Sequence, residues 1–176
     1  MRHWPAGIFA ILVLAGCAGL PADGEAELKL GPPLARFNAD GRLSLRQGAR
    51  SDHLQFDWQH APDRDVVLFS TPLGQGLAEI GREAEGAWLK VPGQVEQRAR
   101  DLPALTQKLL GVPLPLEVLA EWMGGSHPEP QGEVDGWIVV VTESAPYRER
   151  RLPRRIEIRR DDIELKIVII GWGEND

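Results

Sequence analysis

Strict alternation of apolar and polar residues is the sequence feature that most limits the fold of this chain. Leu43 and Leu45 are flanked by polar residues, and Phe56 and Trp58 repeat the pattern further along. Successive side chains of a strand point to opposite faces of a sheet, so a repeat of two predicts strands with one apolar and one wet face. We therefore expect an antiparallel sheet, because antiparallel sheets tolerate water on one side.

Further segments continue this strand pattern on both sides of the middle of the chain. Turn residues separate several of them, so neighbouring strands are expected to pair as antiparallel hairpins. The predicted strand segments after the first two are 66–71, 77–82, 88–91, 137–142, 155–159 and 163–169.

The pattern changes to a helical one between these two groups of strands. Asp101 can cap a helix whose leucines recur at helical spacing and which stops at Gly111. After Pro113 and Pro115, residues 116–123 predict a second short helix that ends at a glycine pair. Because the apolar face of a sheet needs a cover, the economical architecture is a meandering antiparallel sheet that curls around these helices.

The N-terminal segment has the properties of an export signal. Arg2 precedes an apolar run over residues 6–15, which is too short to span a bilayer because spanning takes about 20 apolar residues. A basic start, a short apolar run and small residues before a cut predict a signal peptide over residues 1–16. The sequence LAGC at 14–17 resembles the lipobox of bacterial lipoproteins, so Cys17 is the predicted lipidation site.

The residues after the predicted cut indicate a lipid-anchored domain. Cys17 is the only cysteine, so no disulfide is expected. Ala18 follows it; an Asp there is the usual inner-membrane retention signal in enteric-type bacteria, so Ala18 indicates the outer membrane, with the protein facing the periplasm. Residues 17–36 are rich in Gly, Pro, Ala and acidic residues and predict a flexible tether, and residues 37–176 predict a single domain.

No group of residues matches a catalytic or metal-binding motif. His53, His60 and His127 lie in or beside predicted loops, without metal-ligand spacing or a nucleophile motif. Asp63 and Asp65 could be a carboxylate pair, but a proline-led turn explains them better. We therefore expect no enzyme, no cofactor and no metal site. A formal net charge of −6 argues against nucleic acid as the main partner.

Three features remain that a binding protein could use. One is a turn over 71–74, with Pro72 second and Gly74 fourth, which would leave Leu73 at an exposed tip. Another is a run of arginines over 148–160, suited to anionic lipid headgroups or an acidic partner, although a solvated strand face explains it nearly as well. The last is the apolar sheet face with the helices opposite, which alone is simply a core: Leu43, Leu45, Phe56, Trp58, Val140, Ile156, Ile158, Leu165 and Ile167, facing Leu109, Leu119 and Trp122.

Several short motifs occur together and in the order of a known family. In that order they resemble LolB, the outer-membrane lipoproteins that receive other lipoproteins from the periplasmic carrier LolA. Each fragment alone is weak, but together, behind a lipobox, they are specific. They are Gly41-Arg42-Leu43, Phe56-Asp57-Trp58, Pro72-Leu73-Gly74, Gly111-Val112-Pro113-Leu114-Pro115-Leu116, Trp122-Met123-Gly124-Gly125, Gly136-Trp137, Leu152-Pro153 and Trp172.

The resemblance implies a fold and a function. The fold is mainly β (α+β), an open or half-closed antiparallel β-barrel with short helices covering its concave apolar face. A monomer of this kind would take cargo lipoproteins from LolA, hold their acyl chains in an apolar cavity, and insert them into outer-membrane phospholipid through Pro72, Leu73 and Gly74. The implied cavity residues are Leu43, Leu45, Phe56, Trp58, Trp122, Val140 and Ile158.

One segment departs from the family, and two other functions remain open. The stretch between Trp122 and Trp137 is shorter than usual and contains a predicted Pro/Gly loop over 127–132, which leaves the strand count and the cavity rim open. A lipid-anchored binding protein for a small apolar ligand, or a purely structural lipoprotein, would keep the same lipobox and sheet. Neither needs a leucine exposed to water, so Leu73 separates them from the first function.

Overall fold

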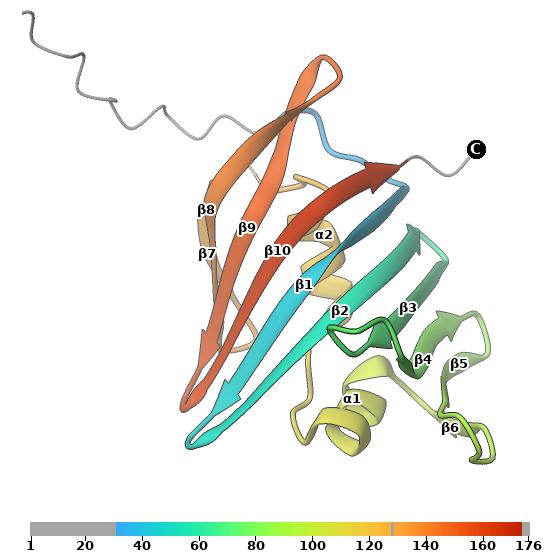
Figure 1. Ribbon diagram of the computed structural model, residues 1–176. Coiled ribbons are helices and arrows are strands. Elements are labelled where there is room, and N and C mark those ends of the chain that lie inside the picture. Colours follow the sequence, from blue (N-terminus) through green and yellow to red (C-terminus); the bar gives the residue numbers. More distant parts are fainter. Residues whose placement is uncertain (1–30, 128, 174–176) are drawn as a thin grey trace, which may run out of the picture.

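One antiparallel sheet of ten strands forms most of the computed structural model, which describes residues 31–127 and 129–173 (Figure 1). The strand order is β6-β5-β4-β3-β2-β1-β10-β9-β8-β7, so the first and last strands pair at the centre and two meanders extend outward from them. The mainly β prediction is confirmed. The strands are β1 (Phe37–Gln47), β2 (Arg50–Ala61), β3 (Arg64–Ser70), β4 (Gly76–Glu83), β5 (Gly86–Lys90), β6 (Gln97–Ala99), β7 (Gln131–Val134), β8 (Trp137–Tyr147), β9 (Arg150–Arg160) and β10 (Ile163–Gly173).

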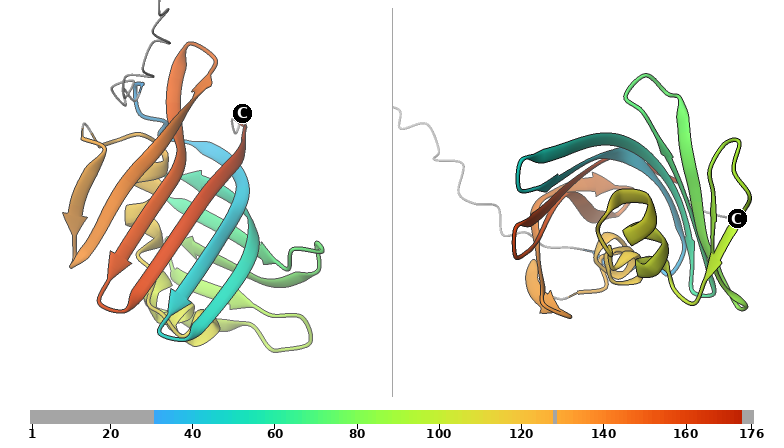
Figure 2. Two further views of the ribbon diagram at one scale, coloured as in Figure 1. Left: turned by 60° about the vertical axis from the view of Figure 1, so that its left-hand side comes forward. Right: turned by 90° about the horizontal axis from the view of Figure 1, so that it is seen from below.

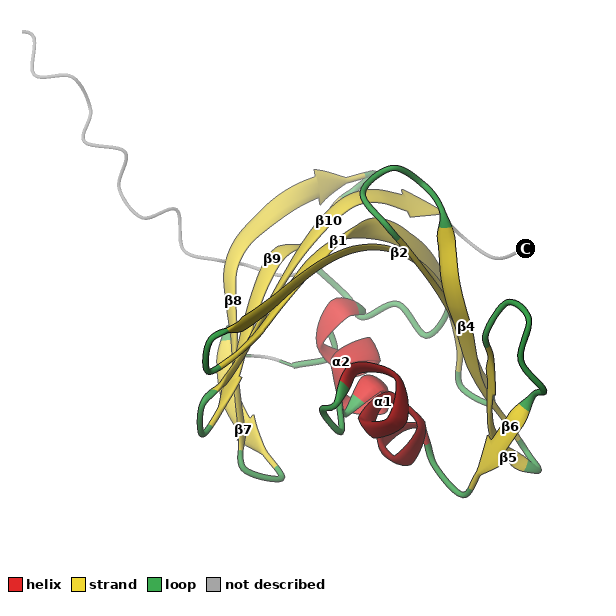
Figure 3. Ribbon diagram, turned by 60° about the horizontal axis from the view of Figure 1, so that its bottom comes forward, coloured by secondary structure: helices red, strands yellow, loops and turns green. Residues whose placement is uncertain are grey.

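The sheet curls around two short helices and leaves its edges apart, as expected of an open barrel (Figure 3). Helix α1 (Leu102–Leu110) lies near β4, β5 and β6, and helix α2 (Leu116–Met123) lies near β9. Both occupy the concave side of the sheet (Figures 2 and 3). Their apolar side chains and those of the inner sheet face form one continuous core.

The alternation in the sequence determines which face of each strand is buried. Leu43 and Leu45 of β1 are buried, whereas Arg42 and Arg46 are exposed. In the register with β10, Leu43 lies opposite Ile167, so inward residues of neighbouring strands meet on the same face. This is the arrangement that a repeat of two predicts.

Both helices have the boundaries that the sequence predicts. Asp101 accepts a hydrogen bond from the backbone N–H of Ala104 at 3.0 Å, which satisfies one of the free donors of the first turn of α1. Gly111 ends this helix in the left-handed region, with φ of 78°, where a residue without Cβ is favoured.

Two short strands were not predicted. Strand β6 is three residues long, and β7 lies partly within the segment expected to be a loop. Both are sheet edges made of mostly polar residues, and β7 pairs with β8 through its backbone. A short edge strand is held by backbone hydrogen bonds, so its residues need not alternate between apolar and polar. The sequence pattern therefore does not reveal it. The prediction of a loop over 127–132 was therefore wrong for its last two residues.

The predicted signal peptide, Cys17 and most of the predicted tether lie outside the described residues. The last part of the tether packs on the domain. Leu34 is buried, and its N–H donates to the carbonyl of Gly124 at 2.7 Å. Gly31 likewise donates to the carbonyl of Arg151 at 2.9 Å.

Candidate functional site

The concave face holds nearly all of the residues predicted to line a cavity. Phe56 and Trp58 come from β2, where alternate residues point inward, and Trp122 comes from α2. The buried members of the predicted set are Leu43, Leu45, Phe56, Trp58, Trp122 and Ile158.

The prediction that Val140 lines the cavity was wrong, because its side chain lies on the other face of the sheet. Its neighbours Val139 and Val141 are the buried residues of this part of β8, and Val140 is only half-buried. The run from Trp137 to Val141 is apolar at every position, so it contains no alternation from which the phase could be determined. In such a run the inward residues follow from pairing, and Val139 pairs with Ile158.

The helices fill most of the space of the predicted cavity. An apolar cavity remains between the sheet and α2, but its volume is only about 10 Å³. That is about the space of a single water molecule. Leu114, Leu116 and Leu119 line it from the helical side, opposite residues that include Phe56 and Trp58. We call these three leucines the plug. A larger cavity would require the plug to move away from the sheet.

Polar and aromatic contacts hold the segment that carries the plug. The link between α1 and α2 bonds to α1 through the N–H of Leu114, which donates to the hydroxyl of Thr106 at 2.8 Å. Thr106 is fully buried, so this hydrogen bond satisfies a polar group that would otherwise be costly to bury. On α2, Trp122 stacks on His127 with ring centroids 4.0 Å apart.

Asp65 is a buried polar centre at the edge of the apolar interior. Its carboxylate accepts hydrogen bonds from Trp58 Nε1 at 3.0 Å, His60 Nδ1 at 2.7 Å and Arg82, whose closer nitrogen lies at 2.6 Å. Burial opposes ionisation of this carboxyl, but the hydrogen bonds from His60, Trp58 and Arg82 outweigh it and hold its pKa below the usual value.

The prediction that Asp65 lies in a turn was wrong. Asp65 is fully buried at an inward position of β3, with Val67 and Phe69 following on the same face. The alternation of inward residues in β3 extends one residue further toward the N-terminus than the predicted strand, and this extension was the available signal for the position of Asp65. Asp63 and Asp65 do not form a carboxylate pair, because Asp63 lies in the turn between β2 and β3 and is exposed.

The loop between β3 and β4 presents Leu73 to solvent, as the turn chemistry predicts. The N–H of Gly74 donates to the carbonyl of Thr71 at 2.8 Å, and Gly74 has φ of 84°. The side chain of Gln55 on β2 donates to the carbonyl of Pro72 at 3.2 Å, which holds the loop against the sheet. Leu73 is 97% exposed.

The Leu73 loop stands on the outer, convex side of the sheet (Figures 2 and 3). Gly74 lines a shallow pocket of about 360 Å³ together with outward-facing Leu68 of β3 and Ile170 of β10. These two residues are exposed large apolar side chains. The loop that carries Leu73 therefore borders a pocket that also contains two exposed apolar side chains.

The arginines of the 148–160 run do not form one patch. Arg155 and Arg159 lie on the outer face of β9. Arg160 lies over the ring of Trp137 at 4.2 Å, and Arg151 donates to the hydroxyl of Ser144 at 3.0 Å. Only part of the run is available to a partner on the outer face.

Within the described ranges, no three His, Cys, Asp or Glu side chains form a group that could hold a metal ion. In the same part of the chain, no helix is long and apolar enough to cross a membrane. An antiparallel sheet of ten strands wrapped around two short helices, with an apolar interior, defines the class of open β-barrels with helices on the concave face.

Comparisons with known proteins identify the family within that class. The family model described as Outer membrane lipoprotein LolB matches residues 35–172. The Outer-membrane lipoprotein LolB of Thiobacillus denitrificans is 33% identical, over 90% of this chain and 91% of its own. That of Chromobacterium violaceum is also 33% identical, over 92% of this chain and 93% of its own.

Solved structures support the fold. A LolA superfamily protein from Nitrosomonas europaea has a TM-score of 0.56 and 11% identity, covering 85% of this chain and 90% of its own. A DUF1329 family protein from Desulfovibrio piger has a TM-score of 0.54 and 8% identity, covering 80% and 86%. The chain belongs to the LolB family. It is an outer-membrane lipoprotein of the lipoprotein-localization (Lol) pathway, and it is not an enzyme.

Proposed function

We propose that this lipoprotein receives other lipoproteins from the periplasmic carrier LolA, holds their acyl chains against its concave face, and inserts them into the inner leaflet of the outer membrane. Lipid on Cys17 would anchor the receptor itself, and the part of the tether before Gly31, where the chain begins to bond to the domain, would give the domain reach. The exposure of Leu73 on a turn held to β2 carries the proposal, because a packed core or a ligand pocket does not account for a leucine in water.

The concave face suits acyl chains for energetic reasons. Burying one CH₂ group contributes about 0.8 kcal/mol, so exposing a long acyl chain to water costs on the order of 10 kcal/mol. A receptor must therefore cover the chain throughout its transfer. The inner face offers Phe56, Trp58 and Ile167 as apolar contacts, all of which are buried.

Acceptance of a chain requires the plug to leave the sheet, since the cavity there holds about 10 Å³. Leu114, Leu116 and Leu119 would then exchange their contacts with the sheet for contacts with the incoming chain. Because one apolar partner replaces another, the net change in free energy is small, and no nucleotide or catalytic residue is needed. Release follows because the bilayer covers the chains still better.

Delivery is the step assigned to Leu73. Burying an exposed leucine contributes about 1.5 to 3 kcal/mol, which is enough to bias an already tethered domain toward the bilayer. The prolyl ring of Pro72 and the left-handed Gly74 fix the turn, so the leucine needs little ordering before it inserts.

The experiment assays uptake and delivery separately for Leu73→Glu. Uptake is transfer of a lipoprotein from the carrier to the receptor, and delivery is its appearance in liposomes. We expect normal uptake and failed delivery. Val95→Glu is the matched control, because Val95 is also a highly exposed apolar side chain, at 87%, in another loop.

Two results would contradict the proposal. Unimpaired delivery by Leu73→Glu would remove the role of the leucine. Failure to take up any lipoprotein, combined with binding of small apolar molecules, would favour the alternative of a lipid-anchored binding protein for a small apolar ligand.

A further inference from the structure

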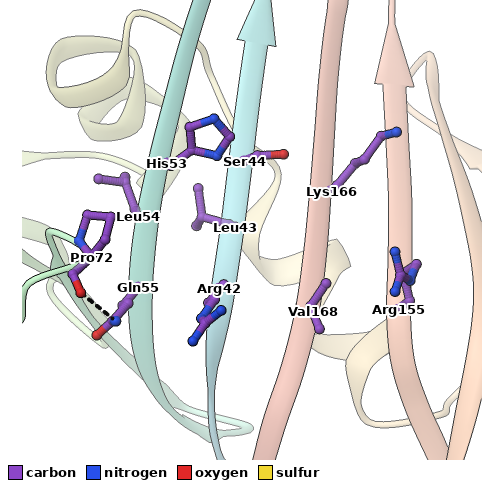
Figure 4. Close-up of a pocket in the computed structure, with 10 residues that line it drawn as sticks. All are labelled: Arg42, Leu43, Ser44, His53, Leu54, Gln55, Pro72, Arg155, Lys166 and Val168. Atoms are coloured by element: carbon purple, nitrogen blue, oxygen red, sulfur yellow. Dashed lines mark hydrogen bonds between the residues drawn. The ribbon is translucent and has the colours of Figure 1, made fainter.

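A groove of about 520 Å³ on the outer face of the sheet is lined by cations (Figure 4). Arg42 of β1, Lys166 of β10 and Arg155 of β9 contribute to its walls, together with His53 of β2. No carboxylate is among the described residues that line it. The chain as a whole has a net charge of −6, so this grouping runs against the average composition of the surface.

Strand register explains how the cations come together. Arg42 lies opposite Val168, and Val168 lies opposite Arg155, so the two arginines stand in one row across three strands. Neighbouring strands are about 4.8 Å apart, which puts the two arginine Cα atoms on the order of 10 Å apart. Lys166 is in the next outward row, opposite Ser44. An anion between these rows would be within reach of all three side chains.

The cations are only partly neutralised by neighbouring carboxylates. Arg155 pairs with Glu143 at 3.3 Å, and Lys166 pairs with Glu164 at 3.3 Å and with Glu157 at 3.8 Å. Arg42 has no carboxylate partner within ion-pair distance in the described part of the chain, although the adjoining pocket contains Asp40. The groove therefore offers one unpaired and two partly paired cations to an external anion.

The groove shares a wall with the Leu73 loop. Pro72 lines it, and the side chain of Gln55, which also lines it, donates to the carbonyl of Pro72 (Figure 4). Pro72 of the loop and the cations thus border the same groove (Figure 4). A surface that meets the leucine at the tip meets the groove as well.

We propose that the outer face of β1, β2, β9 and β10 is the surface that lies on the membrane, with the phosphate of an anionic phospholipid headgroup in the groove between Arg42, Lys166 and Arg155. This deepens the proposed function and rests on insertion of Leu73. Charge complementarity supplies the attraction, and the shared wall sets the headgroup beside the inserted leucine. An acidic protein surface would satisfy the charges but would leave the apolar tip in water.

The test is vesicle binding by the mature chain, residues 17–176, carrying Cys17→Ala so that lipid does not anchor it. The variant is Arg42→Gln with Lys166→Gln. Binding to vesicles containing phosphatidylglycerol should fall about fivefold for each charge removed. The control is Arg98→Gln with Arg100→Gln, which removes the same charge from exposed side chains near β6 and should change binding less than twofold. Melting curves establish that both variants fold.

Leu73→Glu separates failure of this inference from failure of the proposed function. If Leu73→Glu abolishes binding to phosphatidylcholine vesicles while the groove variant binds anionic vesicles normally, the inference is overturned and insertion stands. If neither variant changes vesicle binding, both proposals fall. A groove variant that binds vesicles normally but takes up less lipoprotein from the carrier would assign the cations to an acidic protein and overturn the membrane assignment.

A second measurement reports which face of the domain lies on the membrane. Because Cys17 is the only cysteine, fluorophores can be attached to single new cysteines in the Cys17→Ala chain. Ser51→Cys places the label on the outer face of β2, and Glu121→Cys places it on the exposed side of α2. Quenching by headgroup-labelled lipid is expected at Ser51 and not at Glu121. Stronger quenching at Glu121 would overturn the proposed orientation.

Discussion

Trp58 donates its indole N–H to the Asp65 carboxylate across 3.0 Å, so a buried charge holds this aromatic residue of the concave face. Arg82 and His60 complete the contacts of that carboxylate. A tryptophan that lines an apolar interior usually needs a partner for its N–H, and here the partner is on the neighbouring strand. The ring is therefore held in one orientation whether or not the plug covers it.

We predict that Asp65→Asn destabilises the protein by about 3 kcal/mol, because Arg82 would lose its ionic partner in a partly buried place. For a domain of this size that corresponds to a fall in melting temperature of about 10 °C. Asp57→Asn is the control, since Asp57 is exposed on the other face of the adjacent strand. Equal melting temperatures for the two variants would show that the hydrogen bonds of Asp65 do not stabilise the fold.

A second prediction concerns the pH dependence of stability and follows from the lowered pKa of Asp65. A carboxyl whose pKa is lowered by folding contributes stability that is fully present above its ordinary value of 3.8 and is lost as pH falls through the folded value. The difference in unfolding free energy between the wild type and Asp65→Asn should therefore stay constant from neutral pH to about pH 4 and shrink below it. Denaturant titrations at a series of pH values measure this difference. A decline that is already complete at about pH 5 would assign the effect to another group.

A third prediction concerns Gly41, where the pairing of β1 with β10 contains a bulge. A Cβ at this position would overlap the carbonyl oxygen of Val168 and press on the ring of Phe56. Gly41→Ala should therefore cost about 1 to 3 kcal/mol, the usual effect of overpacking. Gly76→Ala is the control, because a Cβ there meets nothing within 4 Å. Chemical denaturation compares the two, and a neutral Gly41→Ala would contradict the packing argument.

The sequence predicted the elements whose signals are local. The Asp101 cap and Gly111 gave α1 its limits, and the position of Leu73 followed from Pro72 and Gly74. These features depend on residues within one turn or one hairpin. They could be predicted because the side chain or φ requirement of a single residue determines each of them.

Features that depend on pairing between distant segments were missed. Val140 was assigned to the wrong face because its own neighbours are all apolar, and only the register with β9 determines its side. The alternation of β3 was a local signal for the inward position of Asp65, but the partners that allow a charge to be buried there, Arg82 of β4 and Trp58 of β2, come from other strands. The volume left inside the barrel is likewise a property of how the plug packs, which no local pattern describes.

The last prediction tests whether the plug controls access to the concave face. Leu119 is fully buried and lines the small cavity between α2 and the sheet. Leu119→Ala should lower the free energy of unfolding by about 2 to 5 kcal/mol and leave a larger space. It should also weaken the closed arrangement of α2, so that binding of a fluorescent fatty acid increases, because a ligand gains affinity when its competent state is more populated.

Leu102→Ala is the matched control for this prediction. Leu102 is equally buried, but it lies on α1 and is not among the residues of that cavity. Both variants lose the same side-chain atoms, so both should be less stable, and only Leu119→Ala should bind more fatty acid. An equal increase in both would mean that general loosening of the core admits the ligand. No increase in either would contradict control of access by the plug.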